Sequence, residues 1–184
     1  RLLSLDTDGV LTDGGIYFTD AGDELRKFNV KDGLGIQRAQ RAGMKVVVMT
    51  SSIAPAIGHR ARALGVDYVF LEVHDKLAKL TEVCDQLEID FSEVAHVGDD
   101  LTDLAVFEAV GCPMTPNDGV AEAKKRAVYV TTARGGEGAV RNPLLHRPHV
   151  EPVRDLGGQG LVAPPQELDL RQAERGVRPG PGQV

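Results

Sequence analysis

The sequence predicts an α/β fold built on a mostly parallel β-sheet. Short apolar runs that fit buried strands alternate with amphipathic segments of about ten residues, and this alternation is typical of βαβ units. Hydrophobic residues make up 42% of the 184-residue chain and aromatic residues only 4%, with no Trp. We therefore expect a single domain of ordinary size with an aliphatic core.

The expected elements begin with a strand over residues 2–5, whose apolar run fits a buried parallel strand. A hairpin follows, with arms at 14–18 and 24–29 around a turn that contains Gly. Asp32 is expected to cap a helix that ends near Ala42. Beyond it we expect strand 45–50, helix 55–64 with Pro in its first turn, strand 66–71, helix 76–87, strand 94–98, a helix to residue 110, strand 112–115, a helix from residue 120 and strand 128–131.

The character of the sequence changes after Arg141. Seven of the ten prolines lie in residues 142–184, and this segment has no aromatic residue, no Lys and no Ile. Such composition is typical of extended or disordered chain. We therefore expect residues 1–141 to form the folded domain and residues 142–184 to form a tail.

Charge and cysteine content bear on partners and location. The net charge of −6 argues against binding to nucleic acid or to an anionic membrane surface. No run approaches the roughly 20 apolar residues of a membrane span. Cys84 and Cys112 match no metal or redox spacing and are interpreted as core residues in a reducing compartment. A cytoplasmic protein is expected.

Polar side chains gather where the predicted strands end. Because the carboxyl ends of parallel strands meet at one edge of a sheet, these side chains are expected to line one crevice. Carboxylates held close together repel each other unless a cation or a proton lies between them, and their oxygens suit Mg²⁺. The side chains in question are Asp6, Asp8, Thr50, Lys76, Asp99, Asp100 and Asp103.

This set of groups fits phosphoryl transfer. One carboxylate attacks phosphorus as a nucleophile, and a second, two residues on, protonates the leaving oxygen and then activates water. A divalent cation cancels the repulsion between carboxylate and phosphate, and a hydroxyl and an ammonium hold the phosphoryl oxygens.

Each of these residues also has a purely structural interpretation, and Asp6 and Asp8 fit a turn at the end of a strand. Thr50 fits a strand-end hydroxyl bonded to backbone, and Lys76 a solvated residue of a first helical turn, although Lys there opposes the helix dipole. Asp99 and Asp100 fit helix caps, and Asp103 an exposed helix face. The ordered series at successive strand ends is far more specific than any one member.

Five stretches resemble a known family. Residues 6–14 (DTDGVLTDG) resemble the first motif of the haloacid dehalogenase superfamily. Residues 28–36, 75–77, 97–103 and 135–141 are similar to its capless branch, the 3-deoxy-D-manno-octulosonate 8-phosphate (KDO 8-phosphate) phosphatases. The resemblance implies a three-layer Rossmann-like fold without a large cap domain. It also implies a homotetramer in which the hairpins pack together.

The resemblance further implies an Mg²⁺-dependent phosphatase that hydrolyses a sugar phosphate through an aspartyl-phosphate, with KDO 8-phosphate as the expected substrate. Asp6 would be the nucleophile and Asp8 the general acid and base, with Thr50 and Lys76 on the phosphoryl group. Asp6, the backbone carbonyl of Asp8, and Asp99 would hold Mg²⁺, supported by Asp100 and Asp103. The residues expected to bind substrate are Asp8, Asn29, Asp32, Gly33, Ser51, Arg60 and Lys76.

Two positions depart from the family pattern and leave the sugar open. Ser52 stands where the family usually has Arg, and Glu137 replaces the Arg of many octulosonate phosphatases. Phosphatases of nine-carbon ulosonate 9-phosphates (KDN or sialic acid) can carry Glu there, so such a substrate is the first alternative. A non-catalytic assembly module of the same fold is the second. A signalling receiver domain fits less well, because the third strand ends at Leu71-Glu72 without an Asp.

Overall fold

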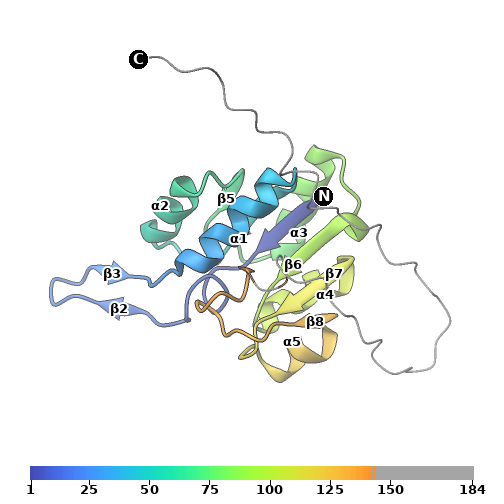
Figure 1. Cartoon of the computed structure of the whole chain (residues 1–184). Helices are drawn as coiled ribbons and strands as arrows, with labels where there is room; N and C mark the ends of the chain where they lie inside the picture. Colours follow the sequence, from blue (N-terminus) through green and yellow to red (C-terminus); the bar gives the residue numbers. More distant parts are fainter. Residues whose placement is uncertain (142, 144–184) are drawn as a thin grey trace, which may run out of the picture. The chain divides into compact units, whose positions relative to one another are not determined.

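The computed structural model describes residues 1–141 and residue 143. The expected tail therefore lies almost wholly outside the described residues. A six-stranded sheet with the order β5-β4-β1-β6-β7-β8 forms the centre, and every pairing within it is parallel (Figure 1). Its strands are β1 (Leu2–Leu5), β4 (Lys45–Met49), β5 (Tyr68–Phe70), β6 (Val94–Val97), β7 (Cys112–Thr115) and β8 (Tyr129–Val130). The expected α/β fold is confirmed.

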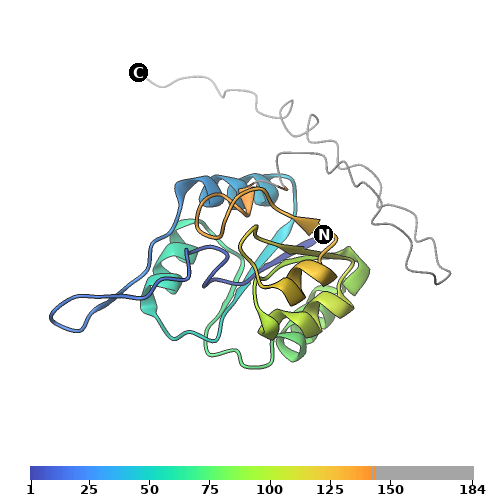
Figure 2. The ribbon, with the colours of Figure 1, turned by 90° about the horizontal axis from the view of Figure 1, so that it is seen from below.

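Helices cover both faces of this sheet, which gives three layers (Figure 2). Along β1, Leu3 and Leu5 join a core cluster with residues of α1 and α2, whereas Leu2 joins a second cluster with residues of α3 and α4. This two-residue alternation is what a strand buried on both faces requires. The helices are α1 (Val30–Arg41), α2 (Pro55–Ala63), α3 (Lys76–Leu87), α4 (Leu104–Ala109) and α5 (Ala121–Arg126), with 3₁₀ turns at Phe91–Glu93 and Leu101–Asp103.

The predicted hairpin projects from the body of the domain (Figure 1). Its strands, β2 (Tyr17–Phe18) and β3 (Glu24–Leu25), are antiparallel and shorter than the expected arms. At its base, Thr12 and Phe28 form an isolated antiparallel bridge. Phe18 is 68% exposed, so the hairpin carries apolar surface that its own domain does not cover.

The first helix begins three residues earlier than predicted. Asn29, not Asp32, is the N-cap of α1, and its side chain accepts a hydrogen bond from the backbone of Lys31. Asp32 instead lies inside the first turn and is buried. The prediction of Asp32 as the cap was wrong because Asn and Asp are equally good caps, and only the tertiary contacts of Asp32 distinguish them.

Smaller differences concern the ends of other elements. The strands expected over 66–71 and 128–131 shorten to β5 and β8, and the helix after β6 begins as a 3₁₀ turn. Among the described residues, no helix is long and apolar enough to cross a membrane.

Candidate active site

Three residues far apart in the sequence meet where β1 and β6 end. The Nζ atom of Lys76 lies 2.9 Å from Oδ2 of Asp6 and 2.6 Å from Oδ1 of Asp103. Asp6 follows β1, Lys76 opens α3, and Asp103 closes the 3₁₀ turn after β6. All three side chains are buried. The predicted convergence of polar strand ends therefore holds for these residues.

Asp99 completes the acidic side of the site. One oxygen of each of Asp6, Asp99 and Asp103 lies within 4.8 Å of the others. The backbone at Gly9 makes room for Asp99, because a Cβ atom at Gly9 would lie 2.0 Å from Asp99 Oδ2, and Gly9 has a φ of +81°. Only glycine fits this cradle without strain.

The acidic group formed by Asp6, Asp99 and Asp103 fits a divalent cation. Oδ1 of Asp99 is buried and has no hydrogen-bond partner in the described part of the chain, which is costly unless another ligand takes the lone pairs. Hard carboxylate oxygens at this spacing are the donors that Mg²⁺ prefers. Asp100, in contrast, is exposed and accepts a hydrogen bond from the backbone of Leu101. Its carboxylate serves as a cap of the 3₁₀ turn.

Burial or the neighbouring charges raise the pKa values of three groups at the site. Burial, with the nearby charges of Asp6 and Asp103, raises the pKa of Asp99 to about 8. Burial also raises the pKa of Asp6 to about 6, against the opposing charge of Lys76. Burial alone lowers the pKa of Lys76, but the charges of Asp6 and Asp103 outweigh it and raise this pKa. Lys76 therefore stays cationic, but its single positive charge is shared by three carboxylates, those of Asp6, Asp99 and Asp103.

Behind the site, a buried histidine holds Asp103. His96 Nε2 lies 3.1 Å from Asp103 Oδ1, and its Nδ1 lies 2.9 Å from Ser4 Oγ. Burial raises the pKa of Asp103, but the hydrogen bonds and charges of His96 and Lys76 outweigh burial and lower it. The other carboxylate oxygen of Asp103 accepts from the backbone N–H groups of Asp99 and Asp100. The sequence analysis gave His96 no role, because a lone His on an apolar strand carries no spacing signal.

Asp8 lies at the mouth of the site, and its carboxylate is a third exposed. Its Oδ1 accepts hydrogen bonds from Arg26 Nε at 2.8 Å and from Thr12 Oγ1 at 3.2 Å. The sequence analysis also missed Arg26. The alternation of Glu24, Leu25 and Arg26 along a hairpin arm was the available signal, since it places Arg26 on the opposite face from Leu25.

Thr50 lies where β4 ends, and it is buried. Its Oγ1 accepts a hydrogen bond from the backbone N–H of Ser52, and the hydroxyl proton remains available to an incoming anion. Ser51 is exposed, and the Oγ of Ser52 caps the backbone N–H of Ala54. The loop that follows β4 thus offers hydroxyl groups and no cation.

The residues expected at the substrate pocket contact one another and the segment after β8. Arg60 packs over Gly33, where a Cβ would lie 2.5 Å from its Nη2 atom, and it donates to the backbone oxygen of Asn29. Asn29 in turn donates to the backbone oxygen of Gly136. The carboxylate of Asp32 is saturated by backbone N–H groups of Gly138, Val140 and Arg141. Asp32 thus ties the first turn of α1 to the segment after β8.

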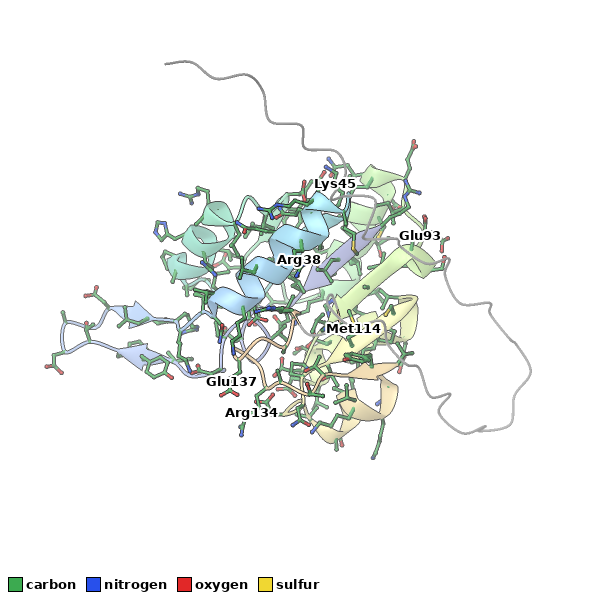
Figure 3. All side chains as sticks on the ribbon, viewed as in Figure 1. Arg38, Lys45, Glu93, Met114, Arg134 and Glu137 are labelled. Atoms are coloured by element: carbon green, nitrogen blue, oxygen red, sulfur yellow. The ribbon has the colours of Figure 1, made fainter. Side chains whose placement is uncertain are left out.

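The loop after β8 packs on the segment that carries Asp8. Gly136 donates to the backbone oxygen of Val10, and a Cβ at Gly135 would lie 1.9 Å from the oxygen of Gly9. Figure 3 shows Arg134 and Glu137 on this loop, near the base of the hairpin. Glu137 is exposed, so its charge faces the solvent at the edge of the site.

Comparison with known proteins first defines the class. The family model for haloacid dehalogenase-like hydrolases matches residues 30–111. Individual relatives then place the chain in one family of this class. The chain is 41% identical over 141 residues to the 3-deoxy-D-manno-octulosonate 8-phosphate phosphatase KdsC of Escherichia coli K12, covering 77% of this chain and 75% of the relative. The KdsC of Yersinia pestis is 38% identical over the same length.

Solved structures agree with this result. The KDO 8-phosphate phosphatase of Moraxella catarrhalis, in complex with magnesium, phosphate and KDO, has a TM-score of 0.76 and 34% identity, covering 78% of this chain and 82% of that one. The phosphatase of Yersinia pestis has a TM-score of 0.76 and 37% identity, covering 79% and 80%. The chain belongs to the KDO 8-phosphate phosphatase family, whose members are phosphoric monoester hydrolases. The predicted family is confirmed, and the magnesium in the Moraxella structure agrees with the predicted cofactor.

Proposed function

We propose that this chain is an Mg²⁺-dependent phosphatase that removes the phosphate from KDO 8-phosphate, the substrate of the KdsC relatives. The observation that carries the proposal is the meeting of Asp6, Lys76, Asp99 and Asp103 at the carboxyl edge of the sheet. Phosphoryl transfer needs a nucleophile, a fixed cation on the phosphoryl oxygens and carboxylates that can bind a divalent cation, and these residues supply all three.

In the proposed reaction, a carboxylate oxygen of Asp6 attacks phosphorus and forms an aspartyl-phosphate while the bond to the sugar oxygen breaks. Asp8 gives its proton to the departing oxygen, and in the second step takes a proton from the water that hydrolyses the intermediate. The ammonium of Lys76 and the hydroxyl of Thr50 hold the phosphoryl oxygens.

Asp6 and Asp99, with the backbone carbonyl of Asp8, would hold the magnesium ion, and Asp103 lies close enough to join or orient them. When bound, the ion neutralises charge between the nucleophile and the phosphate. The raised pKa values of Asp6 and Asp99 support this assignment, because burial disfavours their negative charges and a bound cation would offset that cost.

The residues at the edge of the site bear on which sugar phosphate is the substrate. Glu137 and Ser52 provide no cation for the carboxylate of an ulosonate, whereas Arg60, an expected substrate-binding residue, donates a hydrogen bond to the backbone oxygen of Asn29. A nine-carbon ulosonate 9-phosphate is the competing substrate, because phosphatases of such substrates can carry Glu at the position of Glu137.

A phosphate-release assay tests the proposal. With Mg²⁺, the purified chain is expected to release phosphate from KDO 8-phosphate faster than from KDN 9-phosphate or sialic acid 9-phosphate. Asp6→Asn should abolish release, because the amide cannot act as the nucleophile. Asp85→Asn is the matched control, since Asp85 lies exposed on α3. Turnover that survives in Asp6→Asn would contradict the nucleophile assignment, and no turnover of any sugar phosphate would favour an assembly module.

Assembly and location extend the same proposal. We propose a homotetramer, supported by the exposed apolar side chains of the hairpin, Ile16, Phe18 and Leu25. Analytical ultracentrifugation measures this state directly. A cytoplasmic location is supported by the thiols of Cys84 and Cys112, which are both free.

A further inference from the structure

The carboxylate of Asp8 is held from two sides. Arg26 Nε donates to its Oδ1 at 2.8 Å, and Nη2 approaches Oδ2 at 3.5 Å. Thr12 Oγ1 donates to the same Oδ1 at 3.2 Å. Thr12 belongs to the segment after β1 and Arg26 to the hairpin, so two separate parts of the chain fix one side chain.

Arg26 is not an ordinary surface cation. Its side chain is 3% exposed, whereas the carboxylate of Asp8 is 33% exposed. Its guanidinium also pairs with Glu24. Burying an arginine costs hydration and rotamer freedom, and Glu24 and Asp8 are the charges that offset this cost here. The contact to Asp8 is therefore a fixed part of the fold, unlike the surface ion pairs whose net contribution is small.

The proposed role of Asp8 as general acid depends on the orientation of its carboxylate. A general acid must place its proton within hydrogen-bond reach of the departing oxygen, and a carboxylate that rotates freely does so only part of the time. Oδ1 is engaged by Arg26 and Thr12, whereas Oδ2 has only the long contact to Nη2 and keeps lone-pair capacity for the transferred proton.

We propose that Arg26 is a positioning residue for Asp8, which it holds in the orientation that general acid and base catalysis requires. This inference rests on the proposed phosphatase function. Arg26 acts through Asp8 and touches no reacting atom. The hairpin thus contributes a side chain to the working site in addition to its exposed apolar surface.

The two steps of the reaction make this role measurable. A sugar oxygen needs a proton to depart, but p-nitrophenolate leaves without one. Without Arg26, the first step should slow for the sugar phosphate and stay fast for p-nitrophenyl phosphate. The second step, in which Asp8 activates water, should slow for both. The variant should therefore accumulate aspartyl-phosphate when it is given p-nitrophenyl phosphate.

The main variant is Arg26→Met, which keeps the apolar stem and removes the N–H donors. Its kcat for the sugar phosphate should fall about tenfold or more, less than the roughly 10²–10⁴-fold contribution of general acid–base catalysis because Asp8 itself remains, with KM within about twofold. Rapid mixing with p-nitrophenyl phosphate should give a burst of about one nitrophenolate per site. Arg26→Lys should recover most of kcat, since one strong hydrogen bond from Nε carries the contact.

Two further variants complete the experiment. Lys27→Ala is the matched control, because Lys27 is the next cation on the hairpin and pairs with Asp13, not with Asp8; it should behave as the wild type. Thr12→Val removes the second contact to Asp8 and should give a smaller loss of kcat with the same burst. It keeps the inference testable if Arg26→Met fails to fold.

The outcomes separate the inference from the proposed function. The role of Arg26 is overturned if kcat falls equally for both substrates, without a burst, in Arg26→Met and Thr12→Val. It is also overturned if both variants keep full activity. In either case, turnover by the wild type still supports the phosphatase function. A wild-type chain without turnover, or an active Asp6→Asn, overturns the proposed function and the inference with it.

Discussion

Replacing Asp32 by alanine tests whether this carboxylate serves the fold or the substrate. Its Oδ1 accepts from Val140 at 2.9 Å and from Arg141 at 3.3 Å, and its Oδ2 accepts from Gly138 at 3.1 Å. A hydrogen bond to a charged group contributes about 1.5–3 kcal/mol net. Only one of these three is short, and burial, which raises the pKa of Asp32, offsets part of the gain.

We therefore expect Asp32→Ala to lower the free energy of unfolding by about 3 kcal/mol, which for a domain of this size corresponds to a Tm lower by about 10 °C. The assay is thermal and urea denaturation, with phosphate-release kinetics on the same samples. Asp32→Asn is the matched variant. It keeps one carbonyl oxygen for Val140 and Arg141 but turns an N–H donor toward Gly138, so about half of the loss is expected.

A particular pattern would refute this reasoning. If Asp32→Ala keeps the wild-type Tm to within about 2 °C but raises KM strongly, the carboxylate binds substrate and its backbone contacts are incidental. If Asp32→Asn is as damaging as Asp32→Ala, the retained oxygen contributes nothing.

Two more predictions concern the acidic group. Gly9→Ala should weaken Mg²⁺ binding at least about tenfold in titration calorimetry, because the new Cβ would displace Asp99, a position where the backbone φ of +81° already disfavours alanine. In EDTA, the stability of the wild type should fall as pH rises from about 4 to 8, because folding raises the pKa of Asp99 from 3.8 to about 8 and the folded state binds a proton that the unfolded state releases. Asp99→Asn should flatten this decline in urea denaturation.

Clear results would contradict each of them. Unchanged Mg²⁺ affinity in Gly9→Ala would mean that Asp99 is not a ligand or that it moves freely. An equally steep decline in Asp99→Asn would assign the pH dependence to another group, of which Asp6 is the first candidate since its pKa is also raised.

Much of this fold follows from local patterns. The runs of β1, β4 and β6 are mostly apolar, interrupted by Ser4 and His96, because both of their faces are buried, so their place in a parallel sheet could be read from the sequence. The polar residues behind them then had to meet at one edge. Asp6 and Lys76 do meet there, with Asp103 beside them.

The features that could not be predicted from the sequence depend on contacts between distant segments. The partners of Asp32 lie 106 to 109 residues away, and no local pattern shows that a first-turn acid will bind a loop there. Arg26 reaches Asp8 only because the hairpin folds back at its base through the bridge of Thr12 and Phe28. Strand register of this kind is decided by tertiary packing and not by propensity.

The chain of contacts from Ser4 through His96 and Asp103 has a consequence for Lys76. A lysine on the surface samples many rotamers and must be immobilised each time it captures an anion, at a cost of about 2 kcal/mol. Here the ion pairs with Asp6 and Asp103 hold the side chain in the folded state, so an arriving phosphate meets an ammonium that is already aimed. Such advance ordering favours tight recognition of even a small ligand that offers few contacts of its own.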